Sequence, residues 1–115
     1  HVPVVLLTNG IAAVQRSRLA RSPLRNWISE IVISQEAGIS KPDPEIFRRA
    51  LGGVAPRNGL MIGDGIYSDL RGANLAGVDV CWYNPRRLSL PEGIHAEYTV
   101  RSLKECLPIA LMPDR

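Results

Sequence analysis

The chain has 115 residues, the size of a single domain, and a chain of this length buries about two-thirds of its unfolded surface on folding. Hydrophobic residues make up 45% and charged residues 22% of the sequence, and no apolar run approaches the roughly 20 residues of a membrane helix. No secretory signal precedes the first apolar run. We therefore expect a soluble, cytoplasmic protein without a membrane partner.

Two features of the composition limit the ligands of the chain. The formal net charge is +3, but the arginines are scattered along the sequence without interleaved aromatic residues. Nucleic-acid-binding surfaces gather basic side chains on one face, so we expect no nucleic-acid partner. Cys81 and Cys106 lack the spacing of a metal site or a redox pair, so we expect two reduced thiols.

Apolar segments alternate with segments of helical spacing along the whole chain. Continuous apolar runs predict strands over residues 2–7, 30–34, 59–62, 79–83 and 98–100. Helices are predicted over residues 11–20, 44–51 and 68–76, with a last helix that opens at the capping box 102–105. Asp43 and Pro44 are typical of a helix start, Gly77 is typical of a helix end, and residues 35–42 are predicted as a loop.

This alternation predicts a parallel sheet in a three-layer α/β fold, in which the helices are the crossover connections. Ligands of open parallel sheets bind beyond the carboxyl ends of the strands. Thr8 with Asn9, Ser34 and Asp64 each follow the point where an apolar run ends. We therefore expect these polar residues to lie along one rim of the sheet.

Two carboxylates near the third strand are candidate metal ligands. Asp64 stands between Gly63 and Gly65, and Asp69 follows where a helix is predicted to begin. Magnesium favours oxygen ligands and usually takes one or two carboxylates, several waters and a substrate phosphate. The alternative is that Asp64 occupies a turn and that Asp69 only adds favourable negative charge to a helix N-terminus.

An anion site is the second candidate at the same rim. Thr8 offers a hydroxyl group, and the backbone amides of Asn9 and Gly10 lie where the next helix begins. Lys41, one of only two lysines among 14 basic residues, stands before Pro42 in a short loop, and an ammonium group acts as a point charge toward phosphate. A turn that leaves a strand and a solvated loop lysine are the alternatives.

Together these residues resemble known sequence motifs. Thr8-Asn9-Gly10, the run Gly38 to Asp43, Gly63-Asp64 with Asp69, and the run Gly72 to Gly77 are similar, in this order and at these separations, to motifs two, three and four of the haloacid dehalogenase (HAD) superfamily. Within it, the stretch Leu24 to Ser34 and Cys81-Trp82-Tyr83-Asn84 resemble the YjjG-like pyrimidine 5'-nucleotidases.

The resemblance implies a role for each matching residue. Thr8, with Asn9 and Gly10, would bind the transferring phosphoryl group, and Lys41 would neutralise its charge. Asp64 would be a catalytic ligand of Mg²⁺, and Asp69 would support the metal shell. The implied activity is that of a magnesium-dependent phosphoric monoester hydrolase, with a nucleoside 5'-monophosphate as the expected substrate.

The resemblance also implies parts that this sequence does not contain. Family members attack phosphate with an aspartate of an Asp-x-Asp motif on a central strand, and a cap domain follows that motif. No such motif precedes Val2, so we expect residues 1–115 to be the C-terminal portion of a single HAD-like core domain that is inactive alone. Without the central strand, the flanking strands pair directly, a neighbouring chain fills the position, or a gap remains that favours self-association.

Two other functions remain open at this point. The first is other HAD chemistry, as a dehalogenase or a phosphomutase, although dehalogenases need no magnesium and the pair Asp64 and Asp69 favours phosphate chemistry. The second is a non-catalytic interaction half-domain that binds a partner through its open sheet edge.

Overall fold

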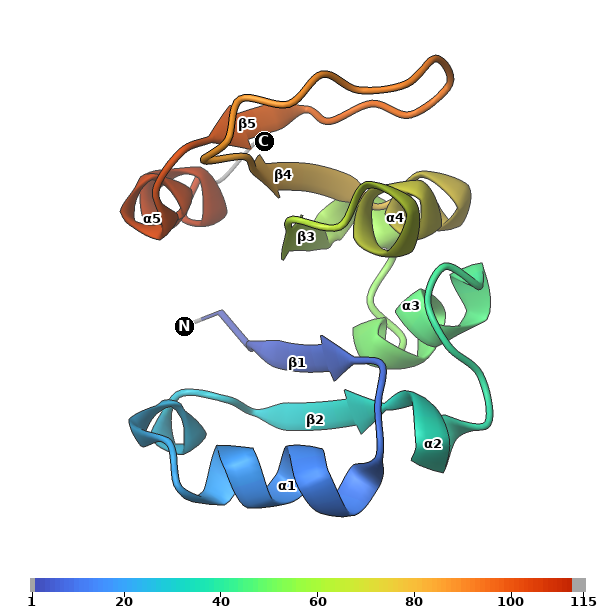
Figure 1. Ribbon diagram of the computed structural model, residues 1–115, viewed down its shortest axis with the longest axis vertical. Coiled ribbons are helices and arrows are strands. Elements are labelled where there is room, and N and C mark those ends of the chain that lie inside the picture. The colour runs from blue at the N-terminus through green and yellow to red at the C-terminus, as the bar shows by residue number, and fades with distance from the viewer. Residues whose placement is uncertain (1, 113–115) are drawn as a thin grey trace.

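The computed structural model describes residues 2–112 and alternates strands with helices (Figure 1). The strands are β1 (Val5–Thr8), β2 (Glu30–Ile33), β3 (Leu60–Gly63), β4 (Asp79–Tyr83) and β5 (Tyr98–Val100). The α-helices are α1 (Ala12–Ala20), α2 (Ser34–Ala37), α3 (Pro44–Leu51), α4 (Arg71–Ala76) and α5 (Cys106–Ala110). Single turns of other helix types are η1 (Pro23–Asn26), η2 (Pro56–Asn58), the π-turn η3 (Ile66–Leu70) and η4 (Leu103–Glu105).

The strands form two separate sheets in which every pairing is parallel. β1 pairs with β2, and β3, β4 and β5 form a second sheet in that order. β1 and β3 are not paired, and Figure 1 shows them facing each other across the middle of the molecule. The α/β fold with parallel strands is therefore as predicted, and direct pairing of the two flanking strands does not occur.

An apolar cavity of about 450 Å³ lies between β1 and β3. We call this cavity the slot; its lining includes Val4, Leu6, Leu51, Met61, Ile62 and Ala110. Leu6 is 36% exposed and Ile62 is 40% exposed, although both lie on strands. Aliphatic side chains that strands leave uncovered gain stability when another apolar surface covers them, so we expect the slot to favour an apolar occupant.

The main core lies between the β3–β5 sheet and the helices α3 and α4. Ile46, Phe47, Leu70, Ala73 and Val80 are each at most 3% exposed. Full burial of one large aliphatic or aromatic side chain contributes about 1.5–3 kcal/mol, so this cluster is the main source of stability. No helix within residues 2–112 is long and apolar enough to cross a membrane.

Local signals predicted several elements with their observed bounds. Helix α3, strand β4 and strand β5 match the predictions, and Asp43 caps α3 by accepting a hydrogen bond from the Glu45 amide at 2.9 Å. Gly77 ends α4 in the left-handed conformation with φ 77°, and the capping box of Ser102 and Glu105 is present.

Several predicted bounds are wrong, and those of β2 and β3 differ by one residue. The first strand begins at Val5 and not at residue 2, since Pro3 has no N–H to donate to a ladder. Residues 34–37 form a short helix, although residue 34 was predicted in a strand and residues 35–37 in a loop, and Gly38 closes the helix with φ 73°. The predicted helix 68–76 begins earlier, as the π-turn η3, because the Leu70 amide donates to the Gly65 carbonyl at 3.0 Å.

Candidate functional site

The turn after β1 is fixed to the loop that carries Lys41. The Asn9 side chain donates from Nδ2 to the Lys41 carbonyl at 3.2 Å and accepts from the Lys41 amide at 3.0 Å. Both polar atoms of this side chain are therefore used to hold the backbone of a residue 32 positions later. Asn9 therefore brings Lys41 to the carboxyl end of β1.

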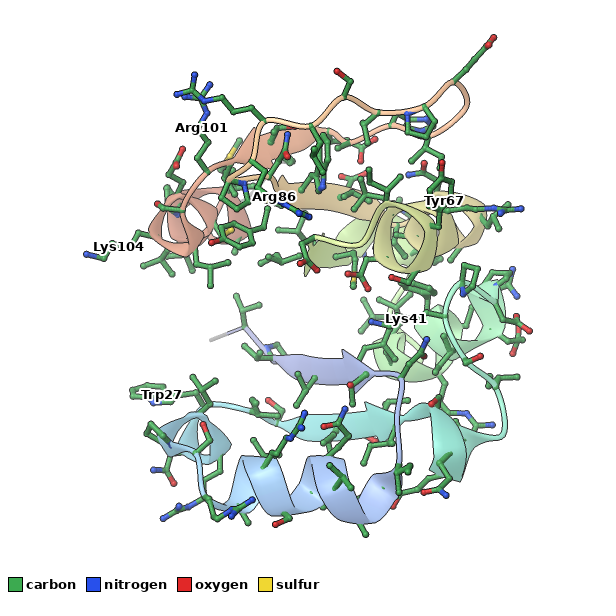
Figure 2. The ribbon with its side chains drawn as sticks, viewed as in Figure 1. Trp27, Lys41, Tyr67, Arg86, Arg101 and Lys104 are labelled. Atoms are coloured by element: carbon green, nitrogen blue, oxygen red, sulfur yellow. The ribbon has the colours of Figure 1, made fainter. Side chains whose placement is uncertain are left out.

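The Lys41 side chain reaches from this loop to the segment after β3. Its Nζ donates to Asp69 Oδ1 at 2.7 Å and to the Leu7 carbonyl at 3.3 Å. The side chains of Lys41 and Asp69 are only 12% and 8% exposed, so this is a largely buried ion pair. Figure 2 shows Lys41 between the part of the molecule that contains β1 and the part that contains β3. The ion pair therefore joins the ends of two strands that do not pair with each other.

The glycines on either side of Asp64 make room for the Asp69 carboxylate. A Cβ atom at Gly63 would lie 2.8 Å from Asp69 Cγ, and one at Gly65 would lie 3.3 Å from Asp69 Oδ2. The Gly65 amide donates to Asp69 Oδ2 at 3.1 Å. A side chain at Gly63 would displace the carboxylate that pairs with Lys41, whereas one at Gly65 would first meet the Ser68 hydroxyl. The run Gly-Asp-Gly is therefore explained by the close approach of a second aspartate to the backbone.

Asp64 and Asp69 lie in different environments. Asp64 is exposed, and its carbonyl accepts a hydrogen bond from Trp82 Nε1 at 3.3 Å. Within residues 2–112 its carboxylate has no ion pair or hydrogen bond, whereas both oxygens of Asp69 already accept one hydrogen bond each. Asp64 is thus the carboxylate with free coordination capacity, and each Asp69 oxygen keeps a second lone pair.

The donor set fits magnesium better than a metal held by protein ligands alone. No group of three or more His, Cys, Asp or Glu side chains that could hold a metal ion occurs in the described part of the chain. Magnesium commonly keeps several waters and binds through one or two carboxylates together with substrate phosphate. Asp64, with Asp69 beside it, provides this kind of partial shell.

Ser34 and Gly10 join the ends of β1 and β2. The Gly10 amide donates to Ser34 Oγ at 2.9 Å, and Ser34 Oγ lies 3.4 Å from the Gly10 carbonyl, to which it donates. The ends of β1 and β2, which carry Thr8, Asn9 and Ser34 of the predicted rim, are therefore joined. Asp64, predicted at the same rim, lies on the segment after β3, which Asp69 connects to the end of β1 through Lys41. The Gly10 amide, one of the predicted anion donors, already has a partner in Ser34.

The sequence patterns did not single out Gln15, which also contacts this rim. Its Nε2 donates to Thr8 Oγ1 at 3.1 Å and to the Asn9 carbonyl at 3.2 Å. A glutamine on an arginine-rich helix resembles a solvated residue in sequence. Its only signal is its position one turn into the helix that follows the Thr-Asn-Gly turn.

With this geometry described, comparison with known proteins identifies the family. The model of the haloacid dehalogenase-like hydrolases matches residues 1–77. The chain belongs to this family of hydrolases, as the motifs indicated.

The similar proteins are phosphatases and a HAD hydrolase. The chain is 42% identical over 108 residues to the pyrimidine 5'-nucleotidase YjjG of Escherichia coli, a match that covers 91% of this chain and 48% of that protein. It is 48% identical over 81 residues to a phosphoserine phosphatase of Thermus thermophilus, covering 69% of this chain and 32% of that protein. The chain thus spans half or less of the length of these relatives.

A solved structure agrees with the same assignment. The crystal structure of the HAD-hydrolase YfnB from Bacillus subtilis, which is bound to magnesium, has a TM-score of 0.89 and 30% sequence identity to this chain. The match covers 97% of this chain and 50% of that one.

Proposed function

We propose that residues 1–115 form the phosphate- and magnesium-binding portion of a HAD-like core domain, in a phosphatase that hydrolyses nucleoside 5'-monophosphates in the cytoplasm. The observation that carries this proposal is the buried ion pair of Lys41 and Asp69, which holds an ammonium group against the Leu7 carbonyl, the residue before Thr8, and against the segment that follows Asp64. The similarity to the nucleotidase YjjG over 91% of the chain supports the choice of substrate.

Each residue of the rim has a role in this proposal. Thr8 donates its hydroxyl hydrogen to a phosphoryl oxygen, and the neighbouring amides of Asn9 and Gly10 line the same turn. Lys41 places its charge against the transferring group, where fixed positive charge stabilises the transition state. Asp64 holds the magnesium ion, and Asp69 fixes Lys41 and supports the metal shell. Magnesium, when bound, neutralises charge on the phosphoryl oxygens.

The slot supports the second part of the proposal. Its lining is mainly apolar and comes from both β1 and β3. We propose that a strand carrying the nucleophilic aspartate fills it in the complete enzyme. The aspartate attacks phosphorus, the alcohol of the substrate leaves, and water then hydrolyses the aspartyl phosphate. The 115-residue chain by itself lacks this covalent step and is expected to be inactive.

A phosphate-release assay tests this function. We would first confirm the intact mass of the purified chain, then measure phosphate release from a pyrimidine 5'-monophosphate with and without magnesium. The same assay is applied to a fusion protein in which the N-terminal half of YjjG precedes residues 1–115. We expect no release by the chain alone and magnesium-dependent release by the fusion protein.

Two lysine variants of the fusion protein make this test specific. Lys41→Ala should reduce turnover strongly, whereas Lys104→Ala, which removes an exposed lysine on η4, should leave it unchanged. Release by the chain alone would show a nucleophile within it and overturn the proposed division of the site. Equal turnover of the two variants would overturn the role of Lys41.

A further inference from the structure

The amide group of Gln15 bridges two oxygens at the end of β1. Its Nε2 lies 3.1 Å from Thr8 Oγ1 and 3.2 Å from the Asn9 carbonyl oxygen, and it donates to both. A side-chain amide nitrogen carries two hydrogens, so Gln15 can donate to both oxygens. Gln15 comes from α1, and it is the side chain through which this helix contacts Thr8 in the described residues.

These two hydrogen bonds decide where the Thr8 hydroxyl hydrogen can go. A hydroxyl group has one hydrogen to donate, and in the structure Thr8 Oγ1 donates it to the Asn9 carbonyl oxygen at 3.2 Å. Because Gln15 already donates to that carbonyl, the carbonyl does not depend on Thr8 for a partner. The carbonyl therefore keeps one hydrogen-bond donor when the Thr8 hydrogen turns from it to an anionic ligand. Donation from Gln15 into Thr8 Oγ1 also polarises the hydroxyl group and makes it a stronger donor.

The backbone provides space for this side chain at Gly10. A Cβ atom at Gly10 would lie 2.8 Å from Gln15 Nε2 and 3.3 Å from both Gln15 Cδ and Gln15 Cγ. The φ of Gly10 is +150°, which L residues adopt at a cost. Gly10 thus permits the Gln15 amide to lie directly over the turn, where it reaches the Thr8 and Asn9 oxygens.

We infer that Gln15 is a positioning residue for phosphate binding, which directs the Thr8 hydroxyl group toward the bound phosphoryl oxygen. This inference rests on the proposed function, since it acts through Thr8. It predicts that Gln15→Met, which keeps the length of the side chain and removes its donors, weakens phosphate binding about tenfold, the size of one hydrogen bond to a charged group. Gln15→Glu places an acceptor and a negative charge against the Thr8 hydroxyl and should weaken binding further.

A second glutamine provides the control. Gln35 Oε1 accepts a hydrogen bond from the Ala12 amide at 2.6 Å, at the start of the same helix. Gln35→Met therefore disturbs the attachment of α1 without removing a hydrogen bond to Thr8. A loss of phosphate affinity that follows from Gln15→Met but not from Gln35→Met cannot come from a general loosening of α1.

The experiment is a double-mutant cycle in the 115-residue chain, with inorganic phosphate as the probe and its dissociation constant read from amide NMR shifts in the presence of magnesium. Gln15→Met should weaken binding about tenfold in the parent chain and by less than twofold when Thr8 is already replaced by Val. Lys41→Ala is included as the variant that tests the phosphate site itself.

The outcomes separate the two proposals. If phosphate binds and Lys41→Ala abolishes binding, but Gln15→Met has no effect or the same effect in both Thr8 backgrounds, the role of Gln15 is overturned and the phosphate site stands. If the parent chain does not bind phosphate, or if Lys41→Ala leaves binding unchanged, the proposed site is overturned, and the inference about Gln15 with it.

Discussion

Replacing Asp69 with Asn should destabilise the chain more than any other isosteric exchange at the rim. The Asp69 carboxylate accepts from Lys41 through Oδ1 and from the Gly65 amide through Oδ2. An asparagine has one acceptor and one donor at these positions, while both partners are donors. One of the two hydrogen bonds is therefore lost, and the Lys41 ammonium remains buried without a counter-charge.

The magnitude follows from the burial of the pair. Removal of one partner from a fully buried ion pair costs about 3–5 kcal/mol. The side chains of Lys41 and Asp69 keep 12% and 8% exposure, and the Leu7 carbonyl remains as an acceptor for Lys41, so the lower end applies. We expect a loss of about 3 kcal/mol in the free energy of unfolding, or roughly 10–15 °C in melting temperature for a chain of this size.

Urea unfolding followed by circular dichroism measures this loss, and a double-mutant cycle assigns it to the pair. Lys41→Met alone should also destabilise the chain, because it leaves the Asp69 carboxylate buried without its cation. The double variant should lose less than the sum of the two single losses, by about 1–3 kcal/mol. Asp43→Asn is the matched control, since asparagine caps a helix about as well as aspartate does.

Two results would refute this reasoning. If Asp69→Asn costs no more than Asp43→Asn, the carboxylate is not held as a buried partner of Lys41. If the losses of the two single variants simply add, each residue stabilises the chain independently, and the ion pair does not join the two halves of the rim.

Three further predictions concern the core, the slot and the cysteines. Gly72→Ala should cost about 1–3 kcal/mol in urea unfolding, because a Cβ atom there meets the ring of Phe47, and an unchanged midpoint would contradict this packing. Ile62→Lys should reduce any concentration-dependent self-association that analytical ultracentrifugation detects. Leu75→Lys, a change at an exposed leucine outside the slot, should not reduce it. Equal effects of the two variants would contradict association through the slot. Burial, with a smaller effect of the neighbouring Cys106 thiol, raises the pKa of Cys81 from 9.0 to about 12. The neutral thiol therefore stabilises the folded chain at neutral pH, and this stability is lost as the pH rises through this range. The unfolding midpoint should therefore fall between pH 9 and pH 12, less so in Cys81→Ala, and identical pH profiles of the two chains would contradict it.

The sequence predicted the rim of the site because the rim depends on where apolar runs end. Thr8 and Asp64 follow such runs, and parallel strands bring their carboxyl ends toward one edge. The same local signals predicted α3, since a capping aspartate followed by proline determines a helix start within two residues. Features that depend on neighbours in sequence could therefore be predicted from the sequence alone.

The contacts between side chains within the site could not be predicted from the sequence in the same way. Lys41 and Asp69 are 28 residues apart, and nothing in the composition of either segment shows that the two side chains pair. The motifs assigned Asp69 to the metal shell, whereas its direct contacts in the structure are Lys41 and the Gly65 amide. Gln15 was missed for a different reason: it lies only seven residues after Thr8, but a glutamine on an arginine-rich helix resembles a solvated residue in sequence.

Within the rim, each of these contacts holds the next residue in place. Gly63 and Gly65 admit Asp69, Asp69 fixes the Lys41 ammonium, and Asn9 fixes the Lys41 backbone against β1. Each contact is made within residues 2–112, while the slot beside them stays uncovered. The groups that would bind phosphate are therefore held in place before any strand enters the slot. A nucleophile that arrives on such a strand would meet a charged site already assembled, which is the arrangement that transition-state stabilisation by fixed charges requires.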